Sequence, residues 1–177
     1  DYNGDGDIND TVNEAAVATP TGFINIKADQ LPATDFQLRA KRDIYVRLID
    51  DRSTVFTDLT LTGFVGGLAS FDPARNVTLD IERNLTVQGG IVAANSTSGH
   101  LELAAANITT DGASVFIAKD LNVVATGGIQ LNTLVDTITA SSTTAGNIDI
   151  NEATGLTVNS VVAKDGAIAI RAGGDMD

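Results

Sequence analysis

The chain has 177 residues, and its 11 Lys and Arg against 23 Asp and Glu give a formal net charge of −12. Binding to the phosphate backbone of nucleic acid depends on clustered Lys and Arg, so this acidic balance predicts no nucleic-acid partner. The absence of Cys excludes disulfides and thiolate metal sites, and apolar runs far shorter than the roughly 20 residues that span a bilayer predict no membrane insertion.

Residues 1–21 differ in character from the rest of the chain and are predicted to be an acidic segment followed by a linker. They open with DYNGDGDIND, in which oxygen-bearing side chains recur at alternate positions and Gly6 allows a sharp bend. Ca²⁺ prefers six to eight hard oxygen ligands, which a loop of this pattern can supply. The loop resembles the calcium loop of dockerin and EF-hand-like modules. The resemblance implies a bound Ca²⁺ and the following metal ligands: Asp1, Asn3, Asp5, Asp7 and Asp10.

The likeness is incomplete at the twelfth position, where the family places an acidic bidentate ligand and this chain has Val12. Asp10 or Glu14 would have to replace that ligand. A second loop is absent, so binding to a cohesin is not expected. The alternative to a calcium site that rigidifies a junction is a solvated acidic turn.

From Gly22 onward the chain consists of short segments in which an apolar residue alternates with a residue that is usually polar. This period of two is typical of a strand with one buried face, and no segment has the helical period over ten or more residues. The sequence therefore predicts an all-β body, residues 22–177. The predicted strands are residues 23–28, 35–40, 43–48, 58–63, 76–81, 84–87, 100–104, 107–110, 114–118, 120–125, 128–131, 137–140, 147–150, 155–158, 160–163 and 167–170.

A loose internal repeat predicts how these strands are arranged. Comparable units begin at Val77, Leu101, Leu121, Ile148 and Ile168, which are 24, 20, 27 and 20 residues apart. Such a spacing suits one rung of a three-sided parallel β-helix, so the body is predicted to be a β-solenoid of about seven irregular three-strand rungs. Residues 22–75 fit this register poorly.

Energetics indicate that the rungs depend on one another. Burying about six aliphatic side chains per rung contributes on the order of 12 kcal/mol. Ordering the backbone costs roughly 1–2 kcal/mol for each of its residues, so a single rung is unstable. The sequence ends in mid-pattern at GGDMD, and open strand edges there would template further pairing. We therefore expect either further chain or end-to-end docking of a second copy.

The C-terminal part of the chain carries a second resemblance. Ile168, Ile170, Ala172, Gly173 and Gly174 stand in the order of the filamentous haemagglutinin-like repeats of large bacterial surface proteins. The likeness covers residues 76–177. It implies a right-handed β-helix exported from a bacterial cell that acts as a stalk or adhesive shaft. The irregular rung length and the lack of the family's amino-terminal secretion domain depart from that family.

The chain offers no convincing catalytic set. His100 is the single histidine, and no G-x-S-x-G nucleophile elbow occurs, so His100 is expected to be a turn residue. Five of the eleven basic residues lie within residues 39–52, where they alternate with apolar and acidic residues: Arg39, Lys41, Arg42, Arg47 and Arg52. We interpret this basic stretch as a mixed-charge outer face. The alternative is a groove for acidic polysaccharide, as in β-helix lyases.

Five Asn-x-Ser/Thr sequons occur, at Asn9, Asn76, Asn84, Asn95 and Asn107. Glycan attachment would place these residues on exposed turns of a secreted protein. The alternative is that Asn and Thr simply suit the beginnings of strands and tight turns.

The sequence thus favours a non-enzymatic, extracellular or cell-surface segment that forms a shaft or filament for adhesion or matrix building. Its expected partners are further copies of itself and surface glycans or the surfaces of host or neighbouring cells. Two alternatives remain open: a polysaccharide-binding or lyase-type β-helix that uses residues 39–52, and a calcium-stiffened β-sandwich module of a tandem surface array.

Overall fold

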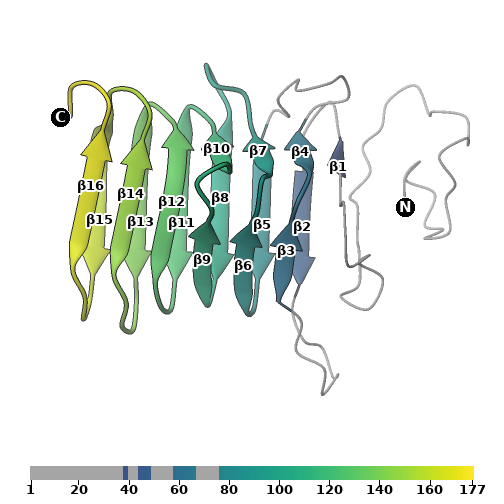
Figure 1. The fold of residues 1–177 in the computed structure, drawn as a ribbon, viewed down its shortest axis with the longest axis horizontal. Coiled ribbons are helices and arrows are strands. Elements are labelled where there is room, and N and C mark those ends of the chain that lie inside the picture. The colour runs from purple at the N-terminus through teal and green to yellow at the C-terminus, as the bar shows by residue number, and fades with distance from the viewer. Residues whose placement is uncertain (1–37, 40–43, 49–57, 67–75) are drawn as a thin grey trace, which may run out of the picture.

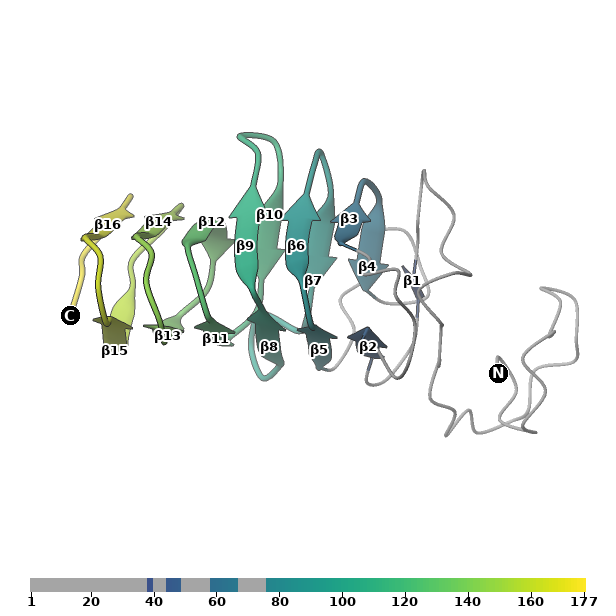
Figure 2. The ribbon, with the colours of Figure 1, turned by 90° about the horizontal axis from the view of Figure 1, so that it is seen from below.

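The computed structural model describes residues 38–39, 44–48, 58–66 and 76–177. Within these ranges all regular elements are β-strands, and they form two sheets that face each other across a common core (Figures 1 and 2). The same ranges contain no helix of the length and apolarity needed to cross a membrane. The predicted acidic segment, residues 1–21, lies outside them.

One sheet has six strands, and their sequence order is also their order in space. All run downward in Figure 1 and form the lower layer in Figure 2. They are β2 (Ile44–Leu48), β5 (Val77–Ile81), β8 (His100–Ala105), β11 (Asp120–Ala125), β13 (Thr137–Ser142) and β15 (Thr157–Ala163).

The other sheet has ten strands, which run in the opposite direction. In this sheet β1 is followed by three rungs that contribute two short strands each, and the last three rungs contribute one longer strand each. The short strands are β1 (Leu38–Arg39), β3 (Leu59–Leu61), β4 (Phe64–Gly66), β6 (Asn84–Val87), β7 (Ile91–Ala93), β9 (Asn107–Thr110) and β10 (Val115–Ile117). The longer strands are β12 (Ile129–Leu134), β14 (Ile148–Glu152) and β16 (Ile168–Ala172).

Every pairing among the described strands is parallel, which confirms the predicted parallel β-solenoid. A β-sandwich of antiparallel strands is therefore excluded. Each inner strand hydrogen-bonds to its counterparts in the rung before and the rung after. The chain therefore coils once per rung, and the rungs stack along the long axis of Figure 1. Residues 44–48, in the region expected to fit the register poorly, pair with β5 in continuous register.

The rungs differ from the prediction in number and in construction. The described residues form about five turns rather than seven, and among them three-strand rungs occur only in the N-terminal part. Leu121 stacks on Leu101 and is followed by Ile138, 17 residues later, whereas Ile148 belongs to the other sheet and stacks on Ile129. The predicted 27-residue unit was wrong because it joined one rung to the first strand of the next.

The change in rung construction occurs at β12. This strand pairs with β9 through its first two residues and with β10 through its last two. In the preceding rung the connection Asp111–Ser114 separates β9 from β10, whereas β12 continues past the equivalent position as one unbroken strand. Removing the interruption shortens the rung and converts a three-strand rung into a two-strand rung.

The core follows directly from the alternation in the sequence. Residues at every second position point inward, and those at equivalent positions of successive rungs form aliphatic columns. Leu79, Leu103, Val123 and Ala140 make one such column on the six-stranded sheet, and each is at most 1% exposed. Burying a side chain of this size contributes about 1.5–3 kcal/mol. The interior is therefore continuous from rung to rung rather than divided into separate cores.

The rung formed by β15 and β16 is covered on one side only. Its inward positions continue the aliphatic columns, but Ile168 is 46% exposed, whereas Ile148 directly above it in the column is fully buried. After β16 the chain turns back, and Met176 pairs in parallel with Leu156. Residues 175–177 therefore follow the path that begins the next coil.

Candidate functional site

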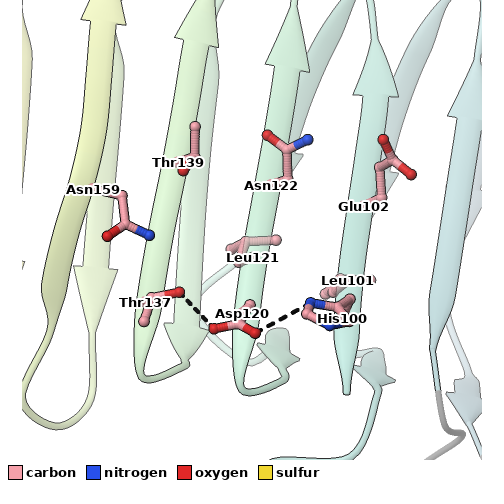
Figure 3. A pocket seen from close by; sticks show the side chains of 9 residues that line it. All are labelled: His100, Leu101, Glu102, Asp120, Leu121, Asn122, Thr137, Thr139 and Asn159. Atoms are coloured by element: carbon pink, nitrogen blue, oxygen red, sulfur yellow. Dashed lines mark hydrogen bonds and ion pairs between the residues drawn. The ribbon is translucent and has the colours of Figure 1, made fainter. Parts of the chain in front are cut away.

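A polar hollow of about 510 Å³ lies on the outer face of the six-stranded sheet, across β8, β11, β13 and β15 (Figure 3). Its lining comes from residues that point away from the core at alternate positions of these strands, together with the flanks of two leucines. They are His100, Leu101, Glu102, Asp120, Leu121, Asn122, Thr137, Thr139 and Asn159. The register of the parallel sheet brings these residues together from segments about one rung apart in sequence.

One row of the hollow is linked by hydrogen bonds across three strands. The His100 Nδ1 atom lies 3.1 Å from Asp120 Oδ2, and the Thr137 hydroxyl donates to Asp120 Oδ1 at 2.8 Å (Figure 3). The carboxylate thus stands between the imidazole and the hydroxyl. The imidazole therefore contacts the carboxylate and not the Thr137 hydroxyl, so this row lacks the order of a nucleophile held by a histidine base.

The imidazole also has the setting of a surface residue. His100 is the first residue of β8, and its side chain is 68% exposed. Its backbone N–H donates to Asn76 Oδ1 at 2.9 Å, which fixes the start of the strand to the preceding rung. The expected turn histidine is therefore a strand-end residue with an ion-pair partner.

A second row of the hollow has polar side chains without such links. Glu102, Asn122 and Thr139 stack in register on adjacent strands. Their side chains form no hydrogen bond or ion pair with any part of the chain that the structure describes. Strands of a sheet are about 4.8 Å apart, so this row presents one unpartnered polar group per strand. Such a row can bind hydroxyl or amide groups of a ligand, but it holds no catalytic pair.

The opposite face differs, because its outward polar side chains bind one another. On the ten-stranded sheet Arg171 Nη1 donates to Asp149 Oδ1 at 2.6 Å and to Asn151 Oδ1 at 3.2 Å. Asn151 continues the row with a longer contact of 3.4 Å from its Nδ2 atom to Asn132 Oδ1. These interactions join three successive rungs and leave fewer free groups for a ligand.

A third cluster lies at the connection between β9 and β10. The Asp111 carboxylate accepts hydrogen bonds from the Ser114 hydroxyl, from Gly89 N at 3.0 Å and from Ala113 N at 3.1 Å. These bonds, above all the one from Ser114, hold the pKa of Asp111 below its ordinary value. The carboxylate remains charged and ties its own turn to the Gly89 turn of the rung above.

The one buried carboxylate among the described residues also serves the backbone. Glu152 is 5% exposed and accepts hydrogen bonds from Val135 N at 3.0 Å and from Thr154 N and Oγ1, both at 2.9 Å. Both of its oxygen atoms are engaged. Its role is to close the turn after β14 and to tie this turn to Val135, a contact that the sequence did not predict because Val135 lies 17 residues away.

The residues predicted to form sites fall largely outside the described ranges. All five predicted calcium ligands lie there, as do Lys41, Arg42 and Arg52 of the basic stretch. Arg39 and Arg47 are placed by their backbones on β1 and β2, on different sheets. Among the residues that are described, no cluster of three or more His, Cys, Asp or Glu is arranged to hold a metal ion.

Comparison of the chain with protein-family models, with curated proteins and with solved structures gave no match.

Proposed function

We propose that this chain is a non-catalytic structural segment of a secreted or cell-surface repeat protein, in which stacked coils form a shaft for adhesion or matrix building. The observation that carries the proposal is the continuous parallel stack, in which inward side chains form an aliphatic core and many outward or corner polar groups bind the neighbouring rung. Such a fold extends along its axis, because each rung contacts only its two neighbours and every coil adds length.

The haemagglutinin-like motif supports this assignment at the level of local structure. Ile168 and Ile170 occupy inward-facing positions of β16, and Ala172 ends the strand. A Cβ atom on Gly173 would lie 2.3 Å from the Ala153 carbonyl oxygen, so the Gly-Gly turn permits close stacking on the preceding turn. These features agree with a repeat that stacks on itself, and membership of that adhesin family is part of the proposal.

Self-association is proposed to occur through the open side of the β15–β16 rung, with a second copy as the occupant. The rung presents an unpaired edge along β16 and along β15 after Val158, together with the half-covered aliphatic columns; residues 175–177 cover only the beginning of β15. The open side of the β15–β16 rung resembles the side that each inner rung turns toward the next rung. Another coil of the same construction therefore fits it. Unpaired edges of this kind are templates for further strands.

Two charge substitutions test this surface. Ile168→Lys places a cation on the open rung, whereas Val124→Lys places one on the outer face of an inner rung, at a similar exposure of 42%. Sedimentation velocity over a range of concentrations should show oligomers of the parent chain and of Val124→Lys, and monomers of Ile168→Lys. A parent chain that stays monomeric at high concentration, or oligomers that persist in Ile168→Lys, would contradict the proposed surface.

The non-catalytic assignment has its own test. A β-helix lyase would cleave uronate polymers by elimination, with a basic residue of the stretch 39–52 abstracting the proton. We expect no unsaturated product from the parent chain with or without Ca²⁺. Eliminative cleavage that disappears in Arg47→Ala would overturn the assignment and establish the alternative enzyme.

A further inference from the structure

The described sequons occupy two different kinds of position. Asn84 and Asn107 are the first residues of β6 and β9, and Asn76 directly precedes β5. Asn95 instead lies in the connection from β7 to β8. N-linked glycosylation requires an accessible side-chain amide nitrogen, so the contacts of each Nδ2 atom discriminate among them.

The amides of Asn84 and Asn107 are part of a ladder along one corner of the solenoid. Asn84 Nδ2 donates to Asp58 Oδ1 at 3.1 Å, and Asn107 Nδ2 donates to Asn84 Oδ1 at 2.8 Å. Asn107 Oδ1 in turn accepts the Gly128 N–H at 2.8 Å. A sugar on either nitrogen would stand where the neighbouring rung is bound.

The hydroxyls of these two sequons are also engaged elsewhere. Thr109 Oγ1 donates to Thr86 Oγ1 at 3.3 Å, so the two threonines contact each other across rungs rather than their own asparagines. Asn76 is likewise tied to the stack, because its Oδ1 accepts the backbone N–H of His100. In the sequons of Asn84 and Asn107 the Thr hydroxyl therefore has its partner on the neighbouring rung and not on its own Asn amide.

Asn95 has the opposite arrangement. Its Oδ1 atom accepts from Thr97 N at 2.9 Å, Thr97 Oγ1 at 2.7 Å, Ser98 N at 3.1 Å and Ser98 Oγ at 3.2 Å. Its Nδ2 atom has no hydrogen-bond partner within the described chain and is not among the buried unpartnered atoms. The Asn amide and the sequon hydroxyl therefore lie on the same side of one turn, with the nitrogen accessible.

The surroundings of this turn leave room for a bulky group. Ser96, Thr97 and Ser98 are all exposed. The turn is anchored behind them by Gly99, whose carbonyl accepts the N–H groups of Lys119 and Asp120. A glycan on this turn would project from the side of the solenoid and would leave the open rung uncovered.

We infer that Asn95 is the N-glycan acceptor among the described sequons, because its Nδ2 atom is accessible and unpartnered on a turn that holds the Thr97 hydroxyl beside it. In the reaction a bond forms between Nδ2 and the anomeric carbon of a lipid-linked oligosaccharide. The bond from that carbon to the donor's phosphate breaks, the phosphate leaves with the electron pair, and the amide loses a proton to a base of the transferase.

The test is glycosylation of the folded chain in an Asn9→Gln background, which confines the readout to described sequons. The protein is incubated with an oligosaccharyltransferase and a lipid-linked oligosaccharide, and occupancy is read by intact mass and peptide mapping. We expect at least tenfold higher occupancy at Asn95 than at Asn84 or Asn107. The glycan should be lost in Asn95→Gln and retained in Ser96→Ala, which keeps the sequon.

A urea-unfolded sample provides the control for geometry, because unfolding should raise the occupancy of Asn84 and Asn107 toward that of Asn95. Two outcomes would overturn the inference. One is an unmodified Asn95 in the folded chain when a peptide spanning residues 90–101 is modified. The other is equal occupancy of Asn84 or Asn107 in the folded chain.

Discussion

Gly146 offers a direct test of how closely the rungs approach at the corner between the two sheets. Its φ of +148° lies in a region that side chains rarely adopt. A Cβ atom at this position would be 2.5 Å from both Gly127 C and Gly128 N. These are backbone atoms of the preceding rung, so they cannot move aside in the way that the end of a flexible side chain can.

The backbone conformation of Gly146 and the overlap of an added Cβ atom with the preceding rung both contribute to the expected loss of stability in Gly146→Ala. A residue held in such a backbone region costs about 1–3 kcal/mol. Forcing an extra carbon into a packed position costs about 1–3 kcal/mol more. The substitution should therefore lower the free energy of unfolding by about 2–6 kcal/mol, which is a large share of the stability of a typical domain.

Two other glycines separate these contributions. Gly89 has a φ of +64° but an added Cβ would meet nothing within 4 Å, so Gly89→Ala measures the backbone cost alone. At Gly112 an added Cβ also meets nothing, and no positive φ occurs, so Gly112→Ala should be neutral or stabilise the fold by about 0.4–1 kcal/mol. Urea unfolding followed by far-ultraviolet circular dichroism gives the midpoints. The reasoning fails if Gly146→Ala unfolds at the same urea concentration as Gly89→Ala.

Three further outcomes are expected. Leu103→Ala should lower the free energy of unfolding in urea by about 2–5 kcal/mol, because Leu103 is fully buried. Val124→Ala, on the outward face, should change it by less than about 0.5 kcal/mol. Equal losses in the two variants would contradict the assignment of Leu103 to the inward face and Val124 to the outward face. Because the pKa of Asp111 is lowered in the folded chain, the folded chain binds fewer protons at this residue than the unfolded chain does. The hydrogen bonds to the Asp111 carboxylate therefore stabilise the fold above the unfolded pKa of about 3.9, and this stabilisation is lost as the pH falls through the folded pKa. Melting temperatures of the parent and Asp111→Asn should therefore converge toward low pH, and a constant difference would refute this. Ca²⁺ should raise the melting temperature of the parent but not of Asp1→Ala/Asp5→Ala; an equal response of both would remove the predicted calcium loop.

The fold class was predictable because alternation and repetition are both local properties of the sequence. The 20-residue steps from Leu101 to Leu121 and from Ile148 to Ile168 each join residues that stack in register. The step from Leu121 to Ile148 failed, because alternation marks which residues face inward but not to which sheet a strand belongs. A rung with one long strand and a rung with two short strands have the same inward pattern.

The candidate site was less predictable than the fold. That His100, Asp120 and Thr137 point outward follows from the alternation around them. That they meet in one hollow depends on the register of strands that begin 20 and 17 residues apart, and this register is set by turns such as Asp111–Ser114. The hydrogen-bonded order of the row could not be read from residue types alone.

The asparagines show why position in the rung, rather than residue type, decides what a polar side chain can do in this fold. At the first residue of a strand, Asn84 and Asn107 are held by the neighbouring rungs, because stacking places an equivalent residue beside each of them. In a connection, Asn95 has no equivalent beside it and folds back on its own turn. Recognition by other molecules should therefore depend on groups that the stack leaves unpaired, namely the Asn95 turn and the row that contains Asn122. Substitutions in the row that contains Asn122 should alter binding without altering stability, whereas substitutions in the corner ladder should alter both.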